Sequence, residues 1–202
     1  SSSSSSSSSP QQQSSGATTI PTKVPNVGSP QAKLPENYSI ESIMKELAAI
    51  NQSGSRKYCI LGTRHCSYLH QQIIELLSYA LILSGNHVFT SGAGGTNAAA
   101  IRGALRAENP SLLTVLLPQS LGKQPRESQE LLAKVVDLGA NLVPSPANDA
   151  LTLDAASRLC NSELLSRVDQ LVSFAFHDSG TVLEAAREAK ELDKVVTVLY
   201  LD

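Results

Sequence analysis

The chain has 202 residues, of which 41% are hydrophobic and 17% charged, and its formal net charge at pH 7 is −2. This length predicts one folded domain with a tail, and the near-neutral charge argues against a protein that covers nucleic acid with its whole surface. No apolar run approaches the length of a membrane span. The three cysteines, Cys59, Cys66 and Cys160, lack metal-ligand spacing and leave one unpaired, which indicates free thiols in a reducing compartment. No metal site and no cofactor are predicted.

Residues 1–37 are of low complexity: nine serines precede Pro10 and three glutamines, and Ser, Thr, Gly and Pro continue to recur after them. Such a segment buries too little apolar surface to offset the entropy cost of ordering it, so we predict a disordered leader. Its serine-rich, acid-poor composition is similar to the downstream part of an organelle transit peptide, although it contains no arginine. A plastid location is therefore expected if the leader is a targeting remnant, and a cytoplasmic one if it is a plain extension.

Residues 38–55 are predicted to form a short helix followed by a linker. Ser39 has the residue type of a helix N-cap, and residues 51–55 read NQSGS, which ends the helical pattern. We expect this helix to pack on the folded domain as an N-terminal addition. Its apolar residues at helical spacing are Ile40, Ile43, Met44, Leu47 and Ile50.

From residue 56 to residue 202 the chain alternates apolar, β-rich runs with amphipathic helical patterns. This alternation predicts an α/β fold with a doubly wound, mostly parallel, six-stranded Rossmann-like sheet covered by helices on both faces. Strands are predicted at residues 58–61, 87–90, 111–117, 141–144, 170–175 and 195–201. Helices are predicted at residues 67–83, 98–106, 128–138, 151–165 and 179–192.

The second predicted strand runs into a glycine-rich turn and then a helix, reading VFTSGAGGTNAAAIR over residues 88–102. This arrangement directs backbone N–H groups and the positive end of the helix at an anion, usually a phosphate. Thr96 or Asn97 could cap the helix and also reach a phosphate oxygen. The simpler alternative is a tight strand-to-helix turn that holds no ligand.

Two named phosphate-binding motifs do not match. A dinucleotide-binding fingerprint requires a third glycine where Asn97 stands and an acid near the end of the next strand, where residues 118–120 read PQS. A P-loop requires Ser or Thr after Gly-Lys, but Gln124 follows Gly122 and Lys123. The turn is therefore suited to phosphate without belonging to either class.

Three turns rich in small residues follow three predicted strands, at residues 62–64, 91–97 and 177–181. Ligands of doubly wound sheets bind outside the carboxyl ends of the strands, so these turns should meet at one rim and bind a phosphorylated ligand. Arg102, one helical turn before Arg106, could extend the site. The predicted ligand-binding residues are Gly62, Thr63, Arg64, Ser91, Gly92, Gly94, Gly95, Thr96, Asn97, Arg102, Ser179, Gly180 and Thr181.

The region from Cys59 to Leu201 resembles the DNA-processing protein A family. That family lies within the wider SLOG superfamily, which also holds the cytokinin-activating "Lonely guy" phosphoribohydrolases. Residues 62–68, GTRHCSY, are similar to the family's Gly-x-Arg…Ser-Tyr motif, and residues 91–105 look like its SGxAxGIDxxAHxxAL element. Residues 179–181 resemble its Ser-Gly-(Ser/Thr) turn. The resemblance implies a homo-oligomer, and it implies a ligand-binding role for Asn161, which occupies the place of the asparagine in the family's Arg-Asn-Arg signature.

The sequence also departs from that family. Cys160 and Ser162 stand where two arginines flank the asparagine, and Asn97 and Ile101 replace an Asp-and-His pair. The loss of two cations weakens the expected grip on single-stranded DNA, because phosphate contacts dominate such affinity.

An enzymatic alternative depends on Glu184. Residues 180–184, GTVLE, are similar to the Gly-Thr-x-x-Glu end of the phosphoribohydrolase motif, which implies that this carboxylate could assist cleavage between a base and ribose phosphate. The preceding residues should read Pro-Gly-Gly-x but read FHDS. Arg158 or Arg167 could supply the arginine partner. Glu184 is equally explained as a first-turn acid that suits the helix dipole.

Three hypotheses follow for the function. The first is a non-catalytic module that binds a nucleotide or single-stranded nucleic acid. The second is a nucleoside 5′-monophosphate phosphoribohydrolase that uses Glu184. The third is a scaffold subunit of a larger complex that has lost its ligand. The sequence leaves open whether the protein is an enzyme.

Overall fold

The computed structural model describes residues 54–202. The leader predicted for residues 1–37, and all but the last two residues of the segment predicted for 38–55, lie outside the described residues. Six strands form the sheet: β1 (Lys57–Gly62), β2 (His87–Ser91), β3 (Leu113–Leu116), β4 (Asn141–Val143), β5 (Gln170–Ala175) and β6 (Val195–Tyr200). The α-helices are α2 (Tyr68–Leu83), α3 (Thr96–Arg106), α4 (Arg126–Asp137), α5 (Leu153–Ser166) and α6 (Gly180–Glu191). Short 3-10 turns are η1 (Pro110–Leu112), η2 (Leu121–Lys123) and η3 (Pro146–Asn148).

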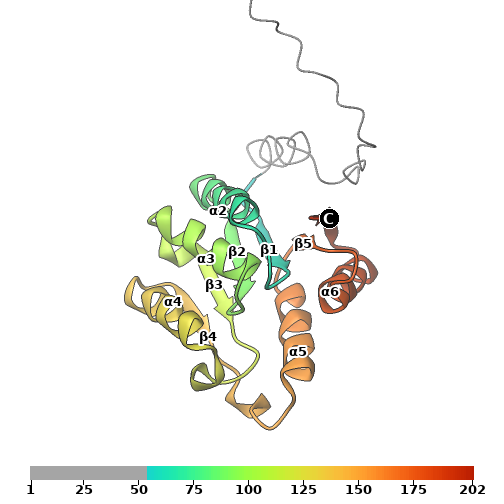
Figure 1. Cartoon of the computed structure of the whole chain (residues 1–202). Helices are drawn as coiled ribbons and strands as arrows, with labels where there is room; N and C mark the ends of the chain where they lie inside the picture. The colour runs from blue at the N-terminus through green and yellow to red at the C-terminus, as the bar shows by residue number, and fades with distance from the viewer. Residues whose placement is uncertain (1–53) are drawn as a thin grey trace, which may run out of the picture. The chain divides into compact units, whose positions relative to one another are not determined.

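All pairings in the sheet are parallel, and the strand order is β4-β3-β2-β1-β5-β6. The chain first adds strands outward from β1 to β4, and then crosses through α5 to place β5 on the other side of β1 (Figure 1). The order therefore reverses between β1 and β5, where Cys59 pairs with Leu171. This arrangement confirms the predicted doubly wound fold and puts the switch point, the usual ligand site of such sheets, beside β1.

The core has two layers because successive strand side chains point to opposite faces of the sheet. Tyr58 and Ile60 of β1 are buried with residues of α2, α3 and α4, whereas Cys59 and Leu61 are buried with residues of α5 and α6. Helices α2, α3 and α4 therefore cover one face of the sheet, and α5 and α6 cover the other (Figure 1). Among the described helices, none is long and apolar enough to cross a membrane.

Close packing of α2 on α3 fixes the position of the glycine-rich turn. Ser78 donates a hydrogen bond to the Ala100 carbonyl at 2.6 Å, and any side chain at Gly103 would collide with the backbone of Glu75. The Glu75 carboxylate, almost fully buried, pairs with Arg106 at 2.9 Å. These contacts join the two helices, so the start of α3 has a defined place at the rim of the sheet.

Several predicted boundaries shift for local reasons. The strand predicted at 111–117 begins only at Leu113, because Pro110 starts a 3-10 turn that occupies the preceding residues. The helix predicted from residue 151 begins at Leu153, because Thr152 is its N-cap. The helix predicted from residue 128 begins at Arg126, directly after Pro125.

Candidate functional site

A cavity of about 620 Å³ lies at the carboxyl ends of the strands. The loops after β1, β2, β3 and β5 contribute to its wall, together with the start of α5. The three turns that the sequence predicted to converge therefore meet in one cavity beside the switch point between β1 and β5. Its predicted wall residues are Gly62, Thr63, Arg64, Ser91, Gly94, Asn97, Asn161, Ser179, Gly180 and Thr181.

The loop after β1 is joined to α3 and β5 by main-chain hydrogen bonds. Thr63 donates its N–H to the Phe174 carbonyl at 2.8 Å and accepts from the Thr96 N–H at 3.0 Å. Gly62 has no room for a side chain, because a Cβ there would lie 2.6 Å from the Thr96 hydroxyl oxygen. Asn97 donates to the Gly62 carbonyl at 3.3 Å. Thr96 and Asn97 thus hold two loops of the cavity together, but the prediction that one of them caps the helix is wrong, because both lie inside its first turn and Gly95 is the N-cap.

Gly95 is the N-cap of α3 and has a positive φ of 61°. Glycine tolerates this region, whereas other residues are strained there. Because glycine has no side chain, no side-chain oxygen caps the first turn of α3. The backbone N–H groups in the first turn of α3 can therefore donate to other acceptors.

Three helices begin at this cavity without a side-chain cap: α3, α4 and α6. Gly94 and Asn97 bring the start of α3 to the wall, Pro125 brings the start of α4, and Gly180 and Thr181 bring the start of α6. An α-helix leaves its first N–H groups unpaired and carries partial positive charge at that end. The cavity is thus surrounded by groups that favour an anion.

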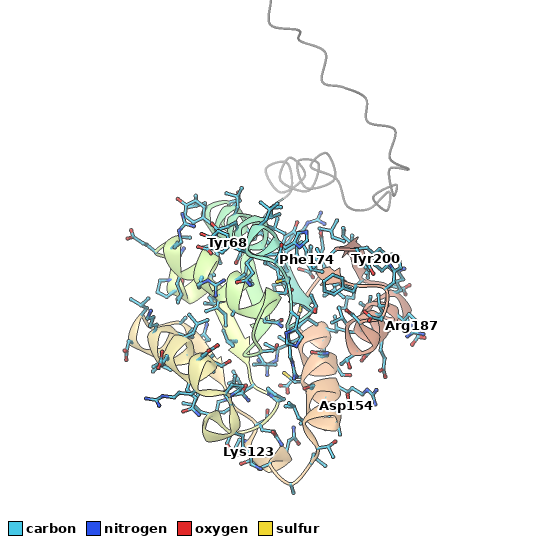
Figure 2. The ribbon with its side chains drawn as sticks, in the orientation of Figure 1. Tyr68, Lys123, Asp154, Phe174, Arg187 and Tyr200 are labelled. Carbon is cyan, nitrogen blue, oxygen red and sulfur yellow. The ribbon has the colours of Figure 1, made fainter. Side chains whose placement is uncertain are left out.

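Charged side chains at the wall add to this preference. Arg64 and Lys123 line the cavity; Arg64 lies 3.4 Å from the Ser157 hydroxyl, and Lys123 donates to the Asp149 carbonyl at 3.1 Å. Asp154 is the acid among the described lining residues, and Arg158 pairs with it at 3.2 Å. Figure 2 shows Lys123 and Asp154 on separate elements, η2 and α5. The wall therefore carries two cations and one paired acid.

The loop that carries Lys123 is fixed by Asp149. The Ser120 N–H donates to the Asp149 carboxylate at 2.8 Å. This backbone hydrogen bond is the main reason that the pKa of Asp149 is lowered, so the carboxylate stays ionised well below neutral pH. Gln119 also crosses to the same segment and donates to the carbonyls of Asn148 and Leu151.

Four predicted ligand-binding residues do not reach the wall. Gly92 packs against the Leu117 side chain, while Gly95 and Thr96 face the backbone and side chains of the β1 loop. Arg102 points to α2, where it donates to Gln71 at 3.0 Å and lies 3.6 Å from the Glu75 carboxylate. Arg102 therefore braces two helices in this structure.

Glu184 lies on α6 beside the cavity but is not among the residues that line it. Its carboxylate pairs with Arg158 of α5 at 3.0 Å, and both side chains are about half exposed. The other arginine considered from the sequence, Arg167, pairs with Glu163 instead. Arg158 is thus the arginine partner of Glu184.

Sequence reasoning missed the contribution of the loop after β3. Pro118, Lys123, Gln124 and Pro125 line the cavity, and Ser157 of α5 faces the same space. This loop carries no recognisable motif, but it follows a predicted strand and so had to end at the same rim. In the described part of the chain, no group of three or more His, Cys, Asp or Glu residues could hold a metal ion.

Solved structures of other proteins have a similar architecture. A DNA processing protein A from Helicobacter pylori superposes with a TM-score of 0.58 and 20% sequence identity, over 74% of this chain and 67% of that one. The fold is similar to that of DNA processing protein A. The Streptococcus pneumoniae DNA processing protein A superposes with a TM-score of 0.52 and 17% sequence identity. The matched region covers 73% of this chain and 50% of that longer protein.

The structure of the Helicobacter pylori DNA processing protein A was described for its single-stranded DNA binding mode. At such low identity the likeness establishes the fold, as the resemblance in residues 62–68 and 91–105 implied. Neither a protein-family model nor a curated protein sequence matches the chain.

Proposed function

We propose that the chain binds a nucleoside phosphate in the cavity at the carboxyl end of the sheet, without catalysing a reaction. The ligand is a free nucleotide or one unit of a nucleic-acid single strand. The observation that carries this proposal is the convergence of three uncapped helix starts and two cations, Arg64 and Lys123, on one cavity. Unpaired helix amides and basic side chains together form a favourable environment for phosphate.

The cavity also suits the rest of a nucleotide. Its volume of about 620 Å³ lies within the range of small-molecule sites. Apolar side chains stand beside the polar rim, which gives a base or a sugar a surface to contact. These apolar wall residues are Leu61, Pro118, Pro125, Leu153 and Val182.

The similarity to DNA processing protein A supports nucleic acid as one source of the phosphate. Two lining cations, with neutral Cys160 on the wall as well, supply fewer charges than a long phosphate backbone requires. The proposal is therefore a site for one nucleoside phosphate at a time.

Calorimetric titration of the full chain with AMP, and separately with an oligothymidylate, tests the proposal and separates the two sources. Arg64→Ala should weaken binding of the preferred ligand by about tenfold or more, because a hydrogen bond to a charged group is lost. Arg187→Ala is the matched control: Arg187 is exposed on α6 and does not line the cavity (Figure 2). Absence of binding by both ligands, or equal losses in the two variants, would overturn the proposal.

The ion pair between Arg158 and Glu184 favours one second candidate, a nucleoside 5′-monophosphate phosphoribohydrolase. The Glu184 carboxylate lies one helical turn beyond Gly180 and Thr181, at the edge of the proposed phosphate site. Release of free base from AMP, abolished in Glu184→Ala, would select this reaction. Non-catalytic binding comes first because Glu184 is held by Arg158 and does not line the cavity.

Three further expectations stay predictions. A scaffold subunit would show neither ligand binding nor base release, and a stable partner would be recovered with it. A plastid location, expected from residues 1–37, is testable with a fluorescent fusion of the full chain. Self-association is testable by light scattering.

A further inference from the structure

Gln124 lies between η2 and α4 and is 7% exposed, yet it lines the cavity. Its main chain is fixed on both sides: its N–H donates to the Leu121 carbonyl at 3.1 Å, and its carbonyl accepts from the Gln129 side chain at 2.8 Å. Its own side-chain carboxamide makes no hydrogen bond to residues 54–202, and it is not among the fully buried unpaired groups, which are the Thr96 and Ser173 hydroxyls. The carboxamide of this mostly buried residue is thus at the cavity wall and has no hydrogen-bond partner in the described part of the chain.

Other buried carboxamides of the described domain are paired. Asn97 donates to Gly62, Gln119 donates to Asn148 and Leu151, and Asn86 accepts from the Arg56 N–H. Buried polar side chains are usually hydrogen-bonded, because an unpaired one loses its hydration without compensation. Among the carboxamide residues that are mostly buried in the described domain, Gln124 is therefore the exception, and it lies at the proposed site.

The surroundings of Gln124 suit a ring. Its Oε1 lies 3.7 Å from the place of a Cβ on Gly92, so the carboxamide stands beside the glycine-rich turn. Pro118 and Pro125, on either side of it in the loop, also line the cavity. A flat apolar group at this place would contact the proline rings while its polar edge faced the carboxamide.

We infer that Gln124 reads the base of the bound nucleotide and selects adenine. This inference rests on the proposed function. A carboxamide offers one acceptor and two donors in a plane, and glutamine pairs with adenine by accepting from the 6-amino group and donating to ring nitrogen 7. A 6-oxo purine presents two acceptors on the same edge and leaves the carboxamide oxygen unpaired.

The test compares three probes on the full chain by calorimetry: ribose 5-phosphate, AMP and inosine monophosphate. The wild-type protein should bind AMP about tenfold more tightly than inosine monophosphate. Gln124→Leu, which keeps the size of the side chain, should abolish that preference and lower the ratio of AMP to ribose 5-phosphate affinity. Gln72→Leu, the same change on an exposed residue of α2, should leave both ratios unchanged.

The outcomes separate this inference from the proposed function. If the wild-type protein binds ribose 5-phosphate but binds AMP and inosine monophosphate equally, the role of Gln124 is overturned and the phosphate site stands. If Gln124→Leu keeps the AMP preference, the role of Gln124 is likewise overturned. If the wild-type protein binds none of the three probes, the phosphate site itself is overturned.

Discussion

Gly95 is the residue on which the start of α3 depends most directly. Its φ of 61° disfavours any other residue, and a Cβ there would press on the backbone carbonyls of Thr63 and Arg64. Gly95→Ala should therefore lower the free energy of unfolding by about 1–2 kcal/mol or more. Urea denaturation measures the change. Gly122→Ala, at a position with open space around it, is the control and should change stability far less.

The three thiols should differ in reactivity. Burial is the main cause that raises the pKa of each thiol: that of Cys160 rises to about 12, that of Cys59 rises further, and that of Cys66 rises although it is only partly buried. Because the thiolate is the reactive form, iodoacetamide at neutral pH should label Cys66 first and the other two only on unfolding. Mass spectrometry of the labelled chain measures the order in which the three thiols react. Rapid labelling of Cys160 in the folded protein would contradict this account.

The sequence predicted that Gly62 and Gly94 lie at one rim of the sheet, and both line the cavity there. Gly62 ends β1 and Gly94 lies in the turn after β2, so the rim that they share follows from the parallel sheet. The prediction for Arg102 followed helical spacing alone, which does not say what the side chain meets. Its partner Glu75 is on a different helix, so the ion pair between them depends on tertiary packing.

At the scale of elements, α5 supplies one wall of the cavity through Ser157, Cys160 and Asn161. Its first turn is capped by Thr152, whose hydroxyl accepts from the Ala155 N–H at 3.3 Å. Thr152→Ala should cost about 1 kcal/mol of stability and weaken nucleotide binding. Thermal unfolding and AMP titration measure the two effects. Thr152→Ser keeps the capping oxygen and should restore both; a loss equal to that of the alanine variant would exclude the cap as the cause.

The strands and helices were predictable because their apolar spacing is strong. The strand at 170–175 was predicted with the boundaries that the structure shows. The turns η1, η2 and η3 were not predicted, because a single 3-10 turn has no periodicity to detect. The part of the cavity wall that sequence reasoning missed, around Lys123 and Gln124, lies beside one of these turns.

The folded domain as a whole should lose stability on mild acidification. Burial, with a smaller contribution from the charge of Lys57, lowers the pKa of His87, which hydrogen-bonds to Thr114 at 2.7 Å. A histidine with a lowered folded-state pKa binds fewer protons folded than unfolded, so stability falls as pH drops through the ordinary imidazole range and recovers as pH rises. Urea midpoints at about pH 7.5 and about pH 5.5 should show this fall, and His87→Gln should reduce it. An unchanged fall in the variant would assign the effect to other groups, such as His70, whose pKa burial also lowers.

The position of the cavity is a property of the complete sheet. Reversal of strand order between β1 and β5 opens the rim, and loops from four strands then surround it. The alternation of strands and helices predicted the rim. The tertiary packing that leaves a cavity there, with three uncapped helix starts around it, could not be read from local patterns.

The central claim is that main-chain amides at this rim receive a phosphate. Titration of the isotopically labelled protein with ribose 5-phosphate, followed by amide chemical shifts, tests it most directly. The largest changes should occur at the amides of Gly94, Asn97, Thr181 and Val182, whereas the Gly180 amide already donates to the Asp178 carbonyl at 2.8 Å. Changes centred on Asn86 and Gly139, at the opposite rim, or no change at saturating ligand, would contradict it.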